Sequence, residues 1–492
     1  MSQNMQVIMV MGGYMVLMIL WGLYQGRKVK TDEDYAIAGR TLPGWAAALS
    51  ERAAGESSWA LLGLPGAAYA TGLVETWTAV GCVIGIITAW AALAWRLRDE
   101  AEKYQVTSFT EYIAKRHREV GSAIRTVGSC VIVFFFFFYV GAQFLGGGKT
   151  LFTLMKIDPQ WGMLITAVVI IPYTIYGGFR SVVYTDVIQA ILMIATLVIG
   201  PIAGILYLAK HPELYAQSIT QALTKAGGGY HSFTNAATGF GIGVVIIGGA
   251  SWFFGYLGGQ PQLSMRFMAI KDARNARQGR NIGIAWTVLA YIGALSIGWI
   301  GLAIFGPAGL TDREYVMPAV MLKLFPPAIA ALLITGAIAA MLSTADSLLI
   351  LSSSELSENI IGPLFRSKHQ NMTKEEKSRS ALIRSRIVTT LLACIALGVA
   401  YISPQKLIFV IVSYVWAGIG CTFSIVILLT LFWKRYHGRA VIATIITGML
   451  FTIIWGVTGL EAVITSRLTT FIAAGIAAIL ATYFIPKKQK ED

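Results

Sequence analysis

The chain has 492 residues, of which 56% are hydrophobic and only 13% are charged. Soluble domains carry about 25% charged residues, so this composition excludes an ordinary soluble protein and predicts a polytopic membrane protein. The formal charge of +14 does not indicate a nucleic-acid partner, because Lys and Arg gather in alternate loops between apolar segments. This positive-inside pattern predicts a cell (plasma) membrane protein with its amino terminus outside and its carboxyl terminus in the cytoplasm.

Apolar stretches long enough to cross about 30 Å of hydrocarbon recur about thirteen times along the chain. They leave no room for a separate soluble domain, so we expect residues 1–492 to form a single integral membrane domain. The first stretch lacks a preceding basic region and a cleavage site, which favours a retained helix over a signal peptide. Between the third and fourth spans, residues 109–118 have the helical spacing of a helix on the cytoplasmic surface. The predicted spans cover residues 5–25, 44–72, 76–97, 121–152, 159–178, 183–208, 237–263, 281–306, 320–360, 382–402, 406–433, 439–458 and 466–485.

The second span contains a polar stretch at residues 49–66, with Glu51, Arg52 and Glu56 followed by Pro65. A charge at the bilayer centre costs at least about 2.5 kcal/mol, so three charges need a water-filled cavity or partners. Backbone that leaves the helix at membrane depth is tolerated only where protein or a cavity surrounds it. We predict a broken helix at a binding site; the alternative is a kinked packing helix whose ends reach the interface.

A second interrupted span follows at residues 248–261, which contain more glycine and proline than a continuous helix tolerates. The two interruptions lie five spans apart, so residues 44–208 and 237–433 can form two inverted repeats of five helices each. Residues 1–43 then precede the repeats, and two additional helices follow at 439–485. The alternative is that these glycines serve close helix packing.

Six motifs along nearly the whole chain resemble one known family. They are Asp34-Tyr35 with Gly39-Arg40, Ser57-Ser58-Trp59 with residues 62–66, residues 173–179, residues 184–189, Gly255-Tyr256 with Gln260-Pro261 and residues 266–268, and residues 343–349. Together they resemble the sodium/solute symporters, and most closely the bacterial sodium/proline symporters. The resemblance implies an all-α, five-plus-five inverted-repeat fold that works by alternating access. It implies symport of sodium and a small solute, most simply proline, into the cell.

The resemblance also implies a sodium site. Sodium is a hard cation that prefers several oxygen ligands held in place, such as carbonyls and hydroxyls. Ser343 and Thr344 supply adjacent hydroxyls on a helix rich in small residues. The alternative is that such hydroxyls bond back to their own helix. By resemblance, the ligands of the co-transported sodium ion are Ala53, Glu56, Ala340, Ser343 and Thr344.

An imino acid needs a partner for its carboxylate, an acceptor for its ammonium and an apolar wall for its ring. Serine hydroxyls and helix N-termini can meet the carboxylate, and aromatic rings can hold the ring and the ammonium. For any single aromatic residue the alternative is ordinary packing. The solute site implied by the resemblance comprises Ser57, Ser58, Trp59, Tyr139, Trp252 and Tyr256.

Three acidic residues leave alternatives open. Asp186 can guide sodium release or pair with Arg180, and Asp346 faces either the cavity or a neighbouring helix. The sodium/proline symporters commonly place an aspartate one residue before the position of Glu56, which makes Glu56 a departure from their pattern. Glu56 then ligates sodium, carries a proton in its place, or pairs with Arg52 four residues earlier.

Other classes of function find less support. The sequence has no HExxH, GxSxG or Walker motif, so we expect no enzyme. The four cysteines have unrelated spacings, which excludes a CxxC metal or redox site. The remaining alternatives are a proton- or sodium-coupled symporter of another amino or carboxylic acid, and a non-transporting sensor. The expected partners are the solute, sodium and the lipid bilayer, with no nucleic acid and no obligate protein partner.

Overall fold

The computed structural model describes residues 3–27, 37–364 and 373–486, and these residues form helices joined by turns. Ten helical segments are long and apolar enough to cross a membrane. One of them, Gly44–Tyr104, is 61 residues long and turns back at Gly72, and two shorter apolar helices add to the ten. Each predicted span therefore falls on a helical segment, which confirms the all-helical polytopic fold.

The first half of the described chain ends with a 52-residue helical run, α9, that is interrupted at Gly178. Gly178 has φ 61° and ψ −178°, a conformation that favours glycine, and it separates the two spans predicted there. The helices of this half are α1 (Gln3–Gly26), α3 (Gly44–Ser58), α4 (Leu64–Thr71), α5 (Thr76–Thr88), α6 (Ala94–Tyr104), α7 (Phe109–Arg116), α8 (Gly121–Met155) and α9 (Pro159–Lys210). The π-helical turns η2 (Trp59–Gly63) and η4 (Ala89–Leu93) connect α3 to α4 and α5 to α6.

The second half differs from the prediction at one point, because the predicted span 320–360 is two helices. Phe325 is extended (φ −124°, ψ 153°), and the prolines that follow it begin a new helix. The helices are α10 (Ile219–Ala226), α11 (Phe240–Ala250), α12 (Trp252–Gly255), α13 (Pro261–Met268), α14 (Ala273–Phe305), α15 (Val316–Leu324), α16 (Pro327–Leu356), α17 (Gly362–Leu364), α18 (Lys374–Ile402), α19 (Ile408–Val415), α20 (Thr422–Phe432), α21 (Gly438–Val457) and α22 (Ser466–Phe484). The turns η6 (Arg313–Tyr315), η7 (Ser357–Ile361) and η9 (Trp416–Cys421) lie before α15, after α16 and before α20.

Both predicted helix breaks are present. The first lies at Ser57, whose φ of 42° and ψ of −166° are not helical. The second separates α12 from α13, where Gly258 has a φ of 82°. A residue other than glycine in the conformation of Ser57 costs of order 1–3 kcal/mol, so the surrounding contacts must hold it there.

Polar caps define the helices outside the membrane core. The Ser108 hydroxyl accepts a hydrogen bond from the backbone N–H of Glu111 and starts α7, which confirms the helix predicted at residues 109–118. Asp272 caps α14 in the same way, by accepting from the backbone N–H of Asn275. That hydrogen bond lowers the pKa of Asp272 below its usual value.

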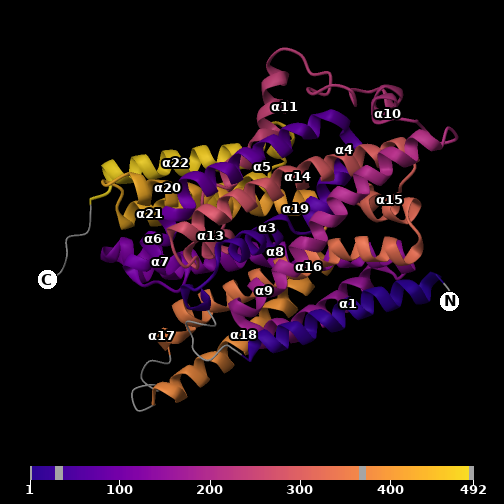
Figure 1. Ribbon diagram of the computed structural model, residues 1–492. Helices are drawn as coiled ribbons and strands as arrows, with labels where there is room; N and C mark the ends of the chain where they lie inside the picture. The colour runs from indigo at the N-terminus through magenta and orange to yellow at the C-terminus, as the bar shows by residue number, and fades with distance from the viewer. Residues whose placement is uncertain (1–2, 28–36, 365–372, 487–492) are drawn as a thin grey trace.

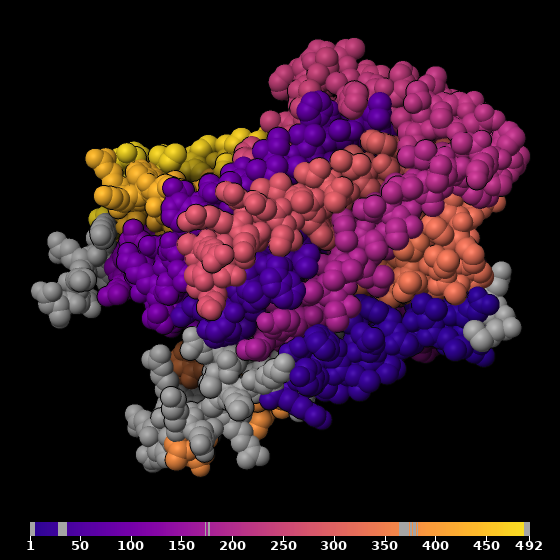
Figure 2. Space-filling model, viewed as in Figure 1, coloured from indigo at the N-terminus to yellow at the C-terminus, as the bar shows by residue number. Residues whose placement is uncertain are grey.

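The helices pack into one elongated bundle with α16 near its centre and α1 at its edge (Figure 1). The span that contains α16 is 83% buried, whereas α1 is 22% buried. Figure 2 shows α1 along the lower edge of the molecule, where it packs against α9. The first residues of α1 and the last residues of α22 lie at opposite ends of the bundle. This placement agrees with termini on opposite sides of a membrane.

The start of α3 lies directly against the start of α14. The backbone N–H of Gly44 donates to the Asn275 side chain at 3.0 Å. A Cβ atom on Gly44 would lie 1.8 Å from the backbone oxygen of Asn275, and one on Gly279 would lie 2.8 Å from the oxygen of Gly44. Glycine at these positions therefore lets the first helix of one predicted repeat touch a helix of the other.

We expect Gly44→Ala to lower the thermal stability of the detergent-purified protein, because overpacking against backbone costs about 1–3 kcal/mol. Gly243→Ala in α11 is the matched control, since no atom lies within 4 Å of its added Cβ. The measurement is the fraction that stays monodisperse on size exclusion after heating. Equal melting of the two variants would contradict the close contact between α3 and α14.

Candidate functional site

The polar groups at the first break make three hydrogen bonds within the protein. The backbone N–H of Trp59 donates to the Ser57 hydroxyl at 3.2 Å, and the backbone N–H of Ser58 donates to the Gln143 side chain at 3.1 Å. The Trp59 indole N–H donates to the carbonyl of Gly55 at 3.2 Å. Polar groups freed by the break are thus satisfied inside the protein, as membrane burial requires.

The aromatic residues of the two breaks meet. Trp59 stacks on Trp252 with ring centroids 4.5 Å apart and an interplanar angle of 8°. Trp416 of η9 lies beside this pair, 5.6 Å from Trp252, with Tyr139 6.1 Å and Tyr256 5.1 Å from the Trp416 ring. Four residues predicted for the solute site therefore lie together with Trp416 in one buried group. We call this group the aromatic cluster; its members are Trp59, Tyr139, Trp252, Tyr256 and Trp416.

Two residues beside the breaks were not predicted from the sequence. Trp416 belongs to none of the six motifs, and Arg467 lies in α22, outside the predicted repeats. The Arg467 guanidinium sits 4.6 Å from the Trp252 ring centroid and donates to the Gly248 carbonyl at 2.8 Å and the Ser251 hydroxyl at 3.1 Å. An arginine near the start of an apolar span was the available signal, but such residues usually reach the interface.

Four buried polar atoms in this region have no hydrogen-bond partner among the residues that the structure describes. They are Ser58 Oγ, Trp252 Nε1, Gln260 Nε2 and Trp416 Nε1. Three are N–H donors and the fourth is a hydroxyl. Buried polar groups are normally paired, so these atoms are available to a ligand with acceptor oxygens.

The two hydroxyls predicted to bind sodium donate hydrogen bonds from α16 to α3 and α9. Thr344 Oγ1 donates to the carbonyl of Ala54 at 3.2 Å, and Ser343 Oγ donates to Asp186 Oδ1 at 2.6 Å. Neither of these bonds returns to α16 itself. Ala53 and Ala340, the other predicted ligands with small side chains, are fully buried on α3 and α16.

Asp186 pairs with an arginine other than the one considered from sequence. Arg266 Nη2 lies 2.9 Å from Asp186 Oδ2, whereas the Arg180 guanidinium stacks near the Tyr184 ring. Ser50 also donates to Asp186, at 2.5 Å. The buried Asp186–Arg266 pair thus joins α9 to α13 beside the predicted sodium residues.

Asp346 accepts a hydrogen bond from the Thr174 hydroxyl at 2.5 Å. Of the two alternatives considered for Asp346, the structure therefore shows contact with a neighbouring helix. The Asp34-Tyr35 motif lies outside the described residues.

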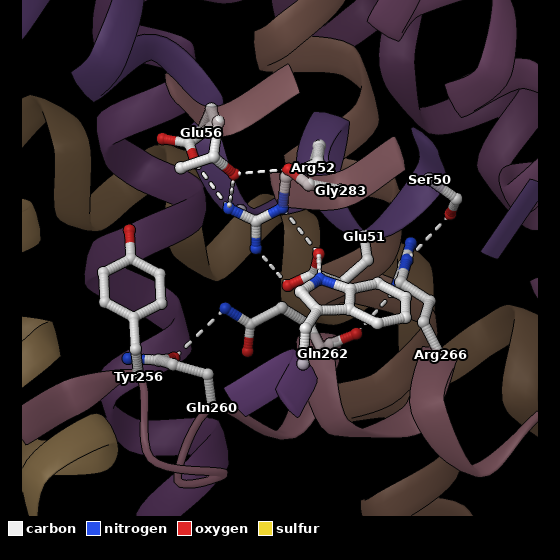
Figure 3. A network of polar contacts seen from close by, with 12 residues as sticks. Ser50, Glu51, Arg52, Glu56, Tyr256, Gln260, Gln262, Arg266 and Gly283 are labelled. Carbon is white, nitrogen blue, oxygen red and sulfur yellow. Dashed lines mark hydrogen bonds and ion pairs between the residues drawn. The ribbon is translucent and has the colours of Figure 1, made fainter. Parts of the chain in front are cut away.

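The charges of the first broken helix form their own network (Figure 3). Arg52 Nη1 lies 2.8 Å from Glu56 Oε1, which is the helical pairing weighed as an alternative. The rest of the Arg52 guanidinium contacts the Glu51 carboxylate, which also accepts from the Trp90 indole at 3.0 Å. Arg52 donates further to Thr287 of α14 at 3.3 Å. All three charged side chains are buried.

This network contains two carboxylates and one guanidinium. Both oxygens of Glu51 accept hydrogen bonds, but Glu56 Oε2 has no partner among the described residues. Figure 3 shows this oxygen pointing away from Arg52. The first break therefore carries an excess of negative charge, which favours a cation nearby.

Comparison with known protein families matches residues 35–448 to the group described as the Sodium:solute symporter family. The chain belongs to the sodium:solute symporter family. Membership makes it a multi-pass membrane protein that couples sodium to the transport of a solute, and not an enzyme.

The curated relatives of this symporter include two Bacillus subtilis proteins. It is 30% identical over 495 residues to the osmoregulated proline transporter OpuE, covering 99% of this chain and 96% of OpuE. It is 30% identical over 473 residues to the high-affinity proline transporter PutP, covering 95% of each.

Solved structures support the inverted-repeat fold of the symporter. A Na⁺-coupled sialic acid symporter in an outward-open state matches with a TM-score of 0.76 at 21% identity, over 100% of both chains. Mhp1, a nucleobase-cation-symport-1 family transporter, matches with a TM-score of 0.53 at 13% identity, over 91% of this chain and 92% of its own. At these identities the likeness shows the fold alone.

We expect Asp186→Ala to lower the free energy of unfolding by about 3–5 kcal/mol, because it leaves the Arg266 cation buried without its carboxylate. Adding Arg266→Leu should recover much of the loss, since the uncompensated charge is then gone. Asp99→Ala is the control, because Asp99 is 49% exposed in its pair with Arg98 and should change stability by less than about 1 kcal/mol. Thermal unfolding in detergent measures all three. A double variant no more stable than Asp186→Ala would contradict this account of the pair.

Proposed function

We propose that this symporter carries a small amphoteric solute, proline first among the candidates, into the cell together with sodium by alternating access. The observation that carries the proposal is the stacking of Trp59 on Trp252, which joins the two broken helices at one buried cluster. Two curated relatives that cover nearly the whole chain, OpuE and PutP, are proline transporters, which supports the choice of solute.

The chemistry around the aromatic cluster suits an imino acid. The unpartnered donors Trp252 Nε1, Gln260 Nε2 and Trp416 Nε1 can meet a carboxylate. Indole faces can hold an apolar ring and attract an ammonium group through their negative π-faces. Because Trp59 and Trp252 are in contact, a solute must lie beside the pair or separate its rings. Ser57, Ser58, Tyr139 and Tyr256 complete the proposed solute site.

We propose that sodium binds between the first break and α16, with ligands from Ala53, Glu56, Ala340, Ser343 and Thr344. The contact of Thr344 with the Ala54 carbonyl supports this, because it brings hydroxyl and freed carbonyl oxygens together. The surplus of negative charge at Glu51 and Glu56 favours a cation in the same region. We propose that Asp186 receives the ion as it leaves; its hydrogen bond with Ser343 supports this role.

The proposed orientation places the amino terminus outside and the carboxyl terminus in the cytoplasm of a cell membrane. The basic residues of α6 and α7 lie at one end of the bundle, where α22 also ends (Figure 1). Residues 44–208 and 237–433 are the proposed repeats, and α21 and α22 are additions to them. A basic cytoplasmic end is what the positive-inside rule requires.

We expect proteoliposomes with an inward sodium gradient and a negative interior to accumulate labelled proline. One inward charge supplies about 2.3 kcal/mol per 100 mV, and a tenfold sodium gradient adds about 1.4 kcal/mol. One-to-one coupling can therefore concentrate the solute about several hundredfold. Sodium and pH gradients should be imposed separately. Uptake that follows the pH gradient and ignores sodium would overturn sodium coupling, and accumulation of another solute only would overturn the assignment of proline.

We expect Ser343→Ala and Thr344→Ala each to raise the sodium concentration needed for half-maximal uptake, because each removes one oxygen ligand. Thr335→Ala is the matched control on α16, since its hydroxyl bonds back to the Ala331 carbonyl at 2.7 Å. Initial uptake rates against sodium concentration give the measurement, corrected for the amount of folded protein. Normal sodium activation in both Ser343→Ala and Thr344→Ala would place the ion elsewhere.

A further inference from the structure

A cavity lies between α6, α7, the start of α8 and η7. Its volume is about 580 Å³, which is in the range of small-molecule sites. Its charged lining residues are Lys103, Lys115, Arg118, Arg125 and Glu358. Four cations and one carboxylate therefore line this cavity.

Neighbouring carboxylates neutralise only part of this charge. Glu111 is shared, because Lys115 lies 3.0 Å and Arg125 lies 3.7 Å from its Oε1. Lys103 is 3.5 Å from Glu100. Arg118 has no ion pair among the described residues. The cavity therefore keeps a surplus of positive charge that an anionic ligand would balance.

The start of α8 adds a second, independent feature that favours an anion. Gly121 and Ser122, the first residues of this 35-residue helix, line the cavity. The preceding residue, Val120, offers no side-chain cap, and the first turn contains no acidic residue. The backbone N–H of Gly121 already donates to the Arg118 carbonyl, so the contribution of this helix start is the positive end of the helix dipole, which attracts negative charge. A phosphate at this end of the helix can pair with the arginines.

The position of the cavity favours a phosphate that belongs to a lipid. α7 buries Phe109, Tyr112 and Ile113 and carries Lys115 and Arg116 in its last turn, as a helix at the membrane surface does. Basic pockets between helices on the cytoplasmic side bind anionic headgroups. We propose that this cavity binds the phosphate of an anionic phospholipid headgroup, held by Arg118, Arg125 and the start of α8.

Such a lipid would connect the surface helix to the helix that carries the proposed sodium residues. Glu358 belongs to η7, which continues directly from α16. The site is nevertheless independent of the proposed solute, because the lipid contacts none of the residues of the aromatic cluster. The proposed lipid site is therefore tested by lipid binding and thermal unfolding, without a transport assay.

The test titrates the full-length protein in neutral detergent with short-chain phosphatidylglycerol or phosphatidylcholine, and follows thermal unfolding and bound lipid by native mass spectrometry. We expect phosphatidylglycerol to bind at least about tenfold more tightly and to raise the unfolding temperature. Each cation near an anionic surface contributes about fivefold in affinity. Arg118→Gln with Arg125→Gln should therefore weaken phosphatidylglycerol binding by about 25-fold.

Arg116→Gln is the matched control, because Arg116 is an exposed arginine of α7 that does not line the cavity. It should change the affinity less than about twofold. Equal affinity for the two lipids, wild-type binding by the double variant, or equal weakening by Arg116→Gln would overturn the proposal. A separate arm adds millimolar inorganic phosphate at constant ionic strength. Full stabilisation by phosphate alone would overturn the lipid source, whereas no stabilisation supports it.

Discussion

Backbone groups that leave a helix inside a bilayer must find partners within the protein, and both broken helices obey this constraint. At the first break, the Gln143 side chain of α8 accepts from the backbone N–H of Ser58. At the second, Ser264 donates to the carbonyl of Gly258, and Arg467 donates to that of Gly248. Ser264 lies only six residues after Gly258, but Gln143 and Arg467 come from helices distant in sequence, so each break depends on the assembled bundle.

The buried charges divide into balanced and unbalanced groups. Asp186 and Arg266 neutralise each other, as a structural pair between helices should. The charges of the Glu51–Arg52–Glu56 network do not cancel, because one guanidinium faces two carboxylates. An excess charge that persists in the middle of a membrane protein is costly unless a ligand offsets it. The surplus negative charge at the first break is the observation behind the sodium site proposed there.

The sequence predicted those features that depend on local composition. Charges and small residues marked the break at Ser57, and a spacing of four residues marked the pairing of Arg52 with Glu56. It could not predict the partner of Asp186, because Arg266 lies 80 residues further along the chain and Arg180 is nearer. No sequence motif marked Trp416 as a member of the aromatic cluster, because packing between distant helices leaves no local pattern in the sequence.

The two polar networks lie on opposite faces of one helix. Ser50 contacts Asp186 on the side of α9 and α16, whereas Arg52, two residues later, contacts Thr287 of α14. Two residues correspond to about 200° around an α-helix, so a single helix separates the networks. That helix is interrupted at Ser57, close to Trp59, which stacks on Trp252 beside the second break. Any movement of α3 therefore alters both networks and the aromatic cluster together, so the proposed ion site and the proposed solute site share one helix.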